Sequence, residues 1–166
     1  WLAMRHYLIS RFSRAEACAR KTINLLNEAG DLWEVQIAAT NLSNILLAQG
    51  RAREAVEVAR EAYYGSRRWN NALGAARALK AWAEASGGKI PRRYLDRELE
   101  RQGTSSYRLY ELVQAEAFLT ASEGRFEEAA DSIEAFFRSH QVFSSFRVLI
   151  YPPLVTWLRL ALESQP

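Results

Sequence analysis

The chain has 166 residues, of which 49% are hydrophobic and 25% charged, and its formal net charge is +3. This apolar content suffices for a folded core and excludes a disordered chain. No run of about eighteen apolar residues occurs, so the composition excludes a membrane-spanning helix. The 22 basic residues are interleaved with 19 acidic ones, which argues against a strongly basic nucleic-acid-binding surface.

Apolar residues recur at intervals of three and four, as at Leu42, Ile45 and Leu46, and no segment alternates like a strand. Seven of the eight glycines, Gly65 and Gly103 among them, stand where such a pattern stops, because glycine accepts the left-handed conformation that closes a helix. In chain order the pattern predicts helices over 1–9, 13–29, 32–49, 52–64, 69–86, 91–102, 105–123, 126–139 and 143–162. The short connections predict antiparallel helix hairpins.

The chain begins at Trp1, inside an apolar helical pattern and without the order of a signal peptide. We interpret it as a fragment of a larger polypeptide. Cys18 is the single cysteine, so no disulfide can form within the chain, and a reducing compartment, the cytoplasm, is expected.

A local pattern recurs at the hairpin turns. Residues 50–55 and 124–129 both read Gly-Arg-x-x-Glu-Ala, residues 10–15 are a weaker copy, and Gly88 stands where another copy belongs. The successive offsets are 40 (50 minus 10), 38 (88 minus 50) and 36 (124 minus 88). A period of this size is typical of helical repeat arrays.

At these two segments the chain resembles tetratricopeptide repeats, and the resemblance extends to small residues between helices at Ser43, Ala81 and Ala117 and at Ala55, Ala59 and Ala62. It implies an all-α fold in one domain over 1–166. The expected architecture is a right-handed α-solenoid of antiparallel hairpins, with repeats at about 1–30, 32–66, 69–103 and 105–140 and a capping helix over 143–162.

Few residues are placed for catalysis. His6 and His140 have no second metal ligand at a suitable spacing, and Gly87-Gly88-Lys89 lacks the preceding glycine and the following Ser or Thr of a phosphate-binding loop. Arg92/Asp96 and Glu98/Arg101 have spacings that predict solvated ion pairs. We therefore expect a protein that is not an enzyme, with no catalytic residue, metal or cofactor.

In the tetratricopeptide register, the first helix of each hairpin lines a concave groove. The residues then predicted to face it are Thr40, Asn44, Leu47, Ala78, Trp82, Ala85, Gln114, Phe118 and Ser122. Trp82 is either a peptide anchor or a core residue. Because the set contains no Lys or Arg, we expect a protein or peptide partner, including other domains of the same polypeptide, and the alternative is a nucleic-acid-binding helical array.

A looser resemblance concerns the parent protein. The period near forty, the stretch Gly30-Asp31-Leu32-Trp33-Glu34 and the preference for Arg over Lys are similar to repeat regions of large bacterial signal-transduction proteins, which join an ATPase to kinase, cyclase or DNA-binding output domains. The resemblance implies that the repeats sense a partner or hold the ATPase at rest.

Overall fold

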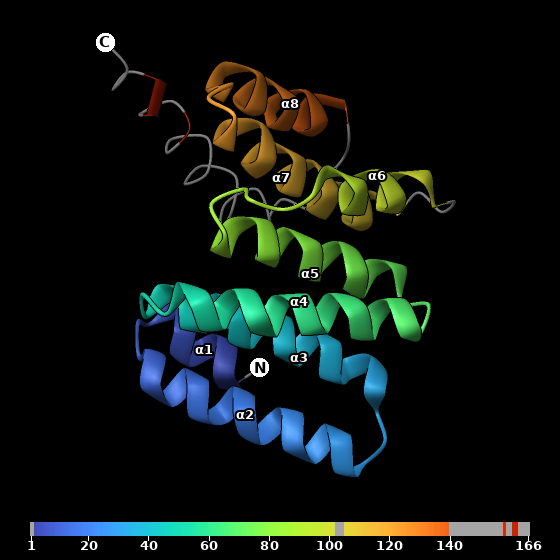
Figure 1. Cartoon of the computed structure of the whole chain (residues 1–166). Helices are drawn as coiled ribbons and strands as arrows, with labels where there is room; N and C mark the ends of the chain where they lie inside the picture. Colours follow the sequence, from blue (N-terminus) through green and yellow to red (C-terminus); the bar gives the residue numbers. More distant parts are fainter. Residues whose placement is uncertain (1, 102–104, 140–157, 159–160, 163–166) are drawn as a thin grey trace.

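The structure is a computed structural model that describes residues 2–101, 105–139, 158 and 161–162. Within these residues it contains eight α-helices and no strand (Figure 1). The prediction of an all-α fold is therefore confirmed, whereas most of the predicted capping helix over 143–162 lies outside the described residues. The helices are α1 (Leu2–Leu8), α2 (Phe12–Glu28), α3 (Leu32–Ala48), α4 (Ala52–Arg68), α5 (Ala72–Ala85), α6 (Arg92–Glu100), α7 (Ser106–Ser122) and α8 (Phe126–Ser139).

Five of the connections are three residues long and share one geometry. The middle residue of each is left-handed, and its N–H donates to the carbonyl three residues before it, while the next N–H donates to the carbonyl five residues before that donor, at 2.8–3.2 Å. This Schellman pattern satisfies carbonyls that a helix end would otherwise leave open. The middle residues are Ser10, Gly30, Gly50, Asn70 and Gly124, with φ values of 55°, 73°, 76°, 52° and 81°.

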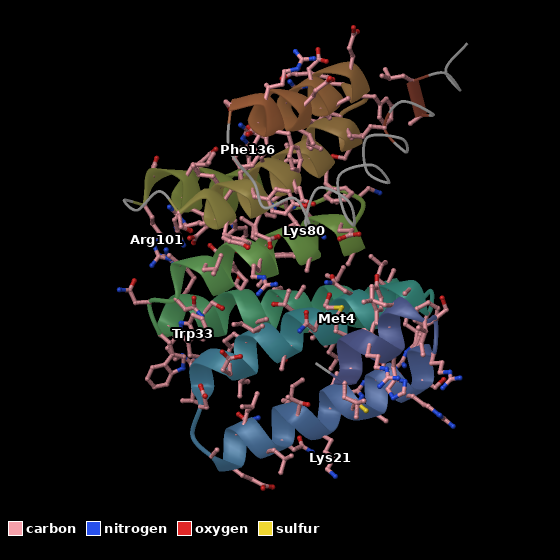
Figure 2. All side chains as sticks on the ribbon, turned by 180° about the vertical axis from the view of Figure 1, so that it is seen from behind. Met4, Lys21, Trp33, Lys80, Arg101 and Phe136 are labelled. Carbon is pink, nitrogen blue, oxygen red and sulfur yellow. The ribbon has the colours of Figure 1, made fainter. Side chains whose placement is uncertain are left out.

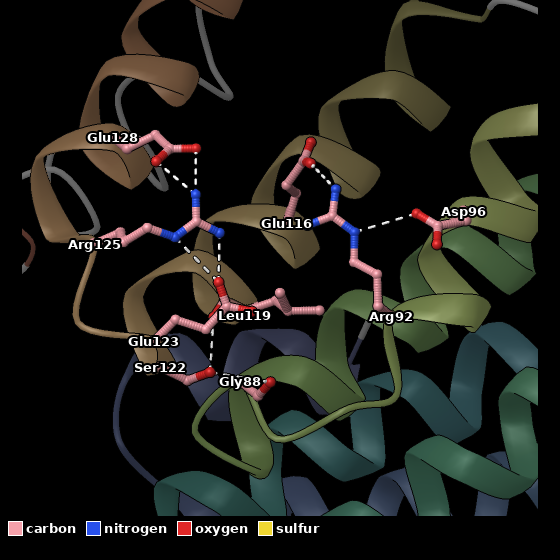
Figure 3. A network of polar contacts seen from close by, with 9 residues as sticks. All are labelled: Gly88, Arg92, Asp96, Glu116, Leu119, Ser122, Glu123, Arg125 and Glu128. Atoms are coloured by element: carbon pink, nitrogen blue, oxygen red, sulfur yellow. Dashed lines mark hydrogen bonds and ion pairs between the residues drawn. The ribbon is translucent and has the colours of Figure 1, made fainter.

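The recurrent Gly-Arg-x-x-Glu-Ala pattern is explained by this turn. Gly50 is the left-handed residue, the Arg51 guanidinium lies 2.6 Å from the Glu54 carboxylate, and Ala55 is fully buried. The second copy has the same arrangement, with a 2.5 Å ion pair between Arg125 and Glu128 (Figure 3). The pattern therefore encodes a helix end, the ion-paired first turn of the next helix and a close helix contact.

Helices α2, α3, α4, α5, α7 and α8 follow one another in chain order along the molecule (Figure 1). Each helix packs against the next one, and in addition α3 packs against α5 and α5 against α7. The small residues predicted to lie between helices are buried: Ser43, Ala81 and Ala117 are at most 1% exposed, and Ser43 Oγ donates a 2.8 Å hydrogen bond to the carbonyl of Ala55. Small side chains let two helices approach closely.

Gly65 does not end a helix, contrary to the prediction. It lies inside α4, which continues to Arg68, and the left-handed residue that closes the helix is Asn70. A side chain at Gly65 would collide with the side chain of Gln36 in α3. The glycine is therefore a site of close helix packing, and α5 begins three residues later than the predicted start at 69.

The α5–α6 pair departs from the regular pattern. Both helices are short, with 14 and 9 residues against 17 in each of α2, α3 and α4. Gly87 and Gly88 are both left-handed, and a Cβ on Gly88 would collide with the backbone carbonyl of Phe118 in α7. The backbone of this connection therefore lies directly on α7.

A buried carboxylate holds α6 in place. Glu98 is 0% exposed, and its oxygens accept hydrogen bonds from the hydroxyl of Tyr63 at 3.1 Å, from Arg67 at 3.2 Å and from Arg101 at 3.1 Å. Arg108 of α7 donates to the backbone carbonyls of Glu98 and Arg101. The Glu98–Arg101 pair was predicted to be solvated and is not, because its carboxylate is buried and bonded to Tyr63 and Arg67 of α4.

The other predicted ion pair of this helix is exposed, as predicted. Arg92 Nε lies 3.2 Å from Asp96 Oδ1, and both side chains are nearly half exposed. Arg92 also reaches Glu116 of α7 at 2.8 Å (Figure 3). Two similar helical spacings, of four and three residues, thus produced a solvated pair at one position and a buried carboxylate at the other.

Substitutions at equivalent positions of the repeated turn should have opposite effects on the stability of the protein. Gly50→Ala should destabilise the protein by about 1–2 kcal/mol, because alanine is strained at φ 76°. Ser10→Gly, at φ 55°, should leave the stability unchanged or raise it, because glycine removes that strain. Urea unfolding measures both, and a stabilising Gly50→Ala would contradict the role given to this turn.

Replacement of Glu98 tests the buried carboxylate. Glu98→Leu should destabilise the protein by about 3 kcal/mol, because three donors lose their acceptor and two of them carry charge. Glu98→Gln retains an acceptor oxygen and should cost less. Glu100→Leu, an exposed change on the same helix, is the matched control and should have little effect; equal unfolding midpoints for Glu98→Leu and this control would refute the assignment.

Candidate functional site

One side of α5 faces away from the core. Apart from Ala72, the residues of this helix that are not buried are Leu73, Arg77, Lys80 and Glu84. Their spacing of three or four places them on one face of the helix. Lys80 lies near the middle of the face seen in Figure 2.

The charged residues of this face form a cluster with α7 and α1. Lys80 Nζ lies 2.5 Å from Glu84 Oε2, and Arg77 Nε lies 3.4 Å from Glu111 Oε1. The side chains of Lys80 and Glu111 are only 16% and 11% exposed. Tyr7 of α1 lies close enough for Glu84 to add to the rise in its pKa that burial causes. Two cations and two anions give the cluster no net charge.

The pKa values show how the cluster is charged. Burial raises the pKa of Glu111, and the opposing effects of Lys80 and Arg77 do not cancel this rise. Burial acts to lower the pKa of Lys80, but Glu84 and Glu111 outweigh it and the pKa is raised. Lys80 therefore stays protonated at neutral pH and cannot act as a nucleophile or general base. The arrangement suits recognition of polar groups.

The structure places the predicted groove residues in different environments. Asn44, Leu47 and Phe118 are partly exposed and Ser122 is exposed. The hydroxyl of Ser122 is directed at backbone carbonyls of Leu119 and Gly88 (Figure 3). Whether any of these residues binds a ligand stays a prediction. The remaining members are buried: Thr40, Ala78, Trp82, Ala85 and Gln114.

Trp82 belongs to the core. Its ring centroid lies 5.3 Å from that of Tyr94 and 6.2 Å from that of Tyr63, and only 7% of the residue is exposed. Of the two interpretations of Trp82, the structure favours the core residue.

The reason lies in the register of α5. Asp31 and Asn71 cap α3 and α5 through the same side-chain hydrogen bond, and they are 40 residues apart (71 minus 31). Lys80 thus corresponds to Thr40, and Glu84 to Asn44. The prediction instead places the groove residues of α5 38 residues after those of α3, which is the offset from Gly50 to Gly88. This offset is smaller than 40 because α5 has 14 residues and α3 has 17. The pair Asn70-Asn71 is the sequence signal that could have given the correct register.

Three findings bear on other kinds of site. Among the described residues, no group of three or more His, Cys, Asp or Glu is arranged to hold a metal ion. No helix in the described part of the chain is long and apolar enough to cross a membrane. Comparison with protein-family models, with curated proteins and with solved structures gave no match.

Replacing Lys80 tests the charge cluster. In Lys80→Met the pKa of Glu111 should rise further, because one of the two cations that oppose the effect of burial is lost. Carboxyl NMR titration measures this shift. Lys89→Met, an exposed change on the α5–α6 connection, should leave it unchanged.

The same variant should change the dependence of stability on pH. A carboxyl whose folded-state pKa is raised stabilises the folded protein while it is protonated. This stabilisation is fully present below the ordinary pKa of 4.5 and is lost as the pH rises through the folded-state pKa. The loss of stability caused by Lys80→Met should therefore be greater near pH 7 than near pH 4. An equal loss of stability at pH 7 and at pH 4 would contradict the electrostatic coupling of Lys80 to Glu111.

Proposed function

We propose that the chain is a non-catalytic protein-interaction module, built as a right-handed α-solenoid of tetratricopeptide type. The recurrence of one Schellman turn between successive stacked helices carries the proposal. Equal turns give successive hairpins nearly equal orientations, so that equivalent side chains form continuous surfaces. Such surfaces are suited to holding an extended or helical segment of another protein.

The proposed binding surface is the face of α3, α5 and α7. Asn44 and Phe118 are partly exposed on it, and the α5 register adds Lys80 and Glu84 between them. An amide, an aromatic ring and a neutral ion pair offer both apolar contact and hydrogen bonds. These groups fit a peptide of mixed polarity.

The charge of this face favours a protein ligand over the nucleic-acid alternative. The cations Lys80 and Arg77 are each within 4 Å of a carboxylate, at 2.5 Å and 3.4 Å. Nucleic-acid binding gains its affinity from cations that neutralise phosphates, and paired cations contribute little of that. We extend the proposal to a regulatory role in a cytoplasmic bacterial signalling protein, where the partner is another protein or another domain of the same polypeptide.

Two substitutions test the proposed surface. Peptides selected from a random library for binding to the wild-type chain serve as ligands, and affinity is measured by fluorescence anisotropy. Asn44→Ala and Phe118→Ala should each weaken binding about tenfold, which corresponds to about 1.4 kcal/mol. Asn27→Ala, on the exposed side of α2, is the matched control.

Folding has to be monitored in the same variants. Circular dichroism and thermal unfolding should show that Asn44→Ala and Phe118→Ala remain folded, since both residues are partly exposed. Unchanged affinity in both folded variants, for every selected peptide, would refute binding at this face.

A further inference from the structure

A second surface lies where α4 and α6 meet. The hydroxyls of Tyr64 and Tyr94 are 2.8 Å apart, and their rings meet edge to face, with centroids 6.3 Å apart and an interplanar angle of 81°. One helical turn further along both helices, Arg67 donates a hydrogen bond to Glu98. Beyond this contact, Arg101 donates one to Asn70. A row of side-chain contacts therefore links the two helices. We call the outer part of this row, around Tyr64 and Tyr94, the tyrosine seam.

Three arginines surround the tyrosine seam. Arg60, Arg93 and Arg97 are exposed, and none of them forms an ion pair with a carboxylate of the described residues. The guanidinium of Arg93 lies 5.3 Å from the centroid of the Tyr94 ring. This distance is within the range of a cation–π interaction.

The charged groups that act most strongly on the two hydroxyls are these arginines. The hydrogen bond with Tyr64 and the positive charges of Arg93 and Arg97 lower the pKa of Tyr94. The hydrogen bond with Tyr94 raises the pKa of Tyr64, while Arg60 and Arg93 oppose that rise. Positive charges therefore act on both hydroxyls.

Two nearby carboxylates are already engaged, and the exposed Glu57, Glu61 and Glu100 form no ion pair among the described residues. Glu98 is fully buried and bonded to Arg67 and Arg101, and Asp96 is paired with Arg92. In α2 and α8, by contrast, an arginine is held by a carboxylate one turn away, as Arg20 is by Glu16 and Arg138 by Glu134. An anionic ligand at the seam would supply the missing partners.

We propose that the tyrosine seam binds an acidic segment of a partner protein. Arginine presents a planar pair of donors that matches a carboxylate, and tyrosine and arginine are among the residues enriched in protein interfaces. Carboxylates of the segment pair with Arg60, Arg93 and Arg97, and its backbone lies across Tyr64, which is 46% exposed. The inference rests on the proposed function for the class of partner, but it uses a different face of the molecule.

The ring geometry favours a peptide over a nucleic acid. Stacking of a base requires a free aromatic face. Tyr64 and Tyr94 meet edge to face with their hydroxyls bonded together, and Arg93 occupies a position over the ring of Tyr94. The seam therefore offers carboxylate binding and edge contacts, not a stacking platform.

The test uses a fluorescein-labelled decaglutamate peptide at low ionic strength, with a labelled decaserine peptide as the uncharged reference. The wild-type chain should bind decaglutamate and not decaserine. Arg93→Glu combined with Arg97→Glu should weaken this binding at least about tenfold, because two attractions become repulsions. Arg14→Glu combined with Lys21→Glu makes the same change of net charge on exposed residues of α2 and should weaken it less than about twofold.

Three results would overturn the proposal. These are unchanged binding of decaglutamate by the Arg93/Arg97 variant, an equal loss in the α2 control, or tighter binding of a labelled decauridylate that the same variant abolishes. Thermal unfolding verifies that both double variants are folded. Peptides selected against the α3, α5 and α7 face should still bind the Arg93/Arg97 variant, so failure at the seam is distinguishable from failure of the proposed function.

Discussion

The left-handed turn between helices is the constraint on which the rest of the structure depends. It fixes how each helix end passes into the next helix within three residues, and it recurs at Ser10, Gly30, Gly50 and Asn70 at intervals of 20 residues (30 minus 10, 50 minus 30, 70 minus 50). Because the turn satisfies its own backbone hydrogen bonds, it needs no distant contact to form. Equal turns then bring equivalent faces of α3 and α5 into line, including Thr40 with Lys80 and Asn44 with Glu84.

The tyrosine seam arises where this regularity is interrupted. The short α6 has too few residues to be held by apolar packing alone, with Leu95 as its one buried apolar residue. Two neighbouring helices fix its position. Arg67 of α4 donates to the buried Glu98 carboxylate, and Arg108 of α7 donates to the Glu98 backbone carbonyl. This arrangement also sets Tyr94 against Tyr64 and leaves Arg93 and Arg97 on the outer side.

The two surfaces differ in charge, and this difference separates their proposed ligands. On α5 each cation faces a carboxylate, so that face attracts no strongly charged ligand and its contacts depend on shape and hydrogen bonds. At the tyrosine seam the arginines have no acidic partner among the described residues, so long-range attraction of an acidic segment is expected. The two proposals together describe a module that holds two segments at once.

The sequence by itself determined the all-α class, the approximate bounds of the helices and the turns, because apolar periodicity and left-handed residues act over a few positions. It could not determine that Gly65 lies within α4, that Trp82 lies in the core or that the Glu98 carboxylate is buried. These outcomes depend on Gln36, which packs against Gly65, and on Tyr63, which contacts both Trp82 and Glu98, and both residues lie far away in the chain. Only the tertiary structure brings such residues together, since similar helical spacings leave the Arg92–Asp96 pair solvated and the Glu98 carboxylate buried.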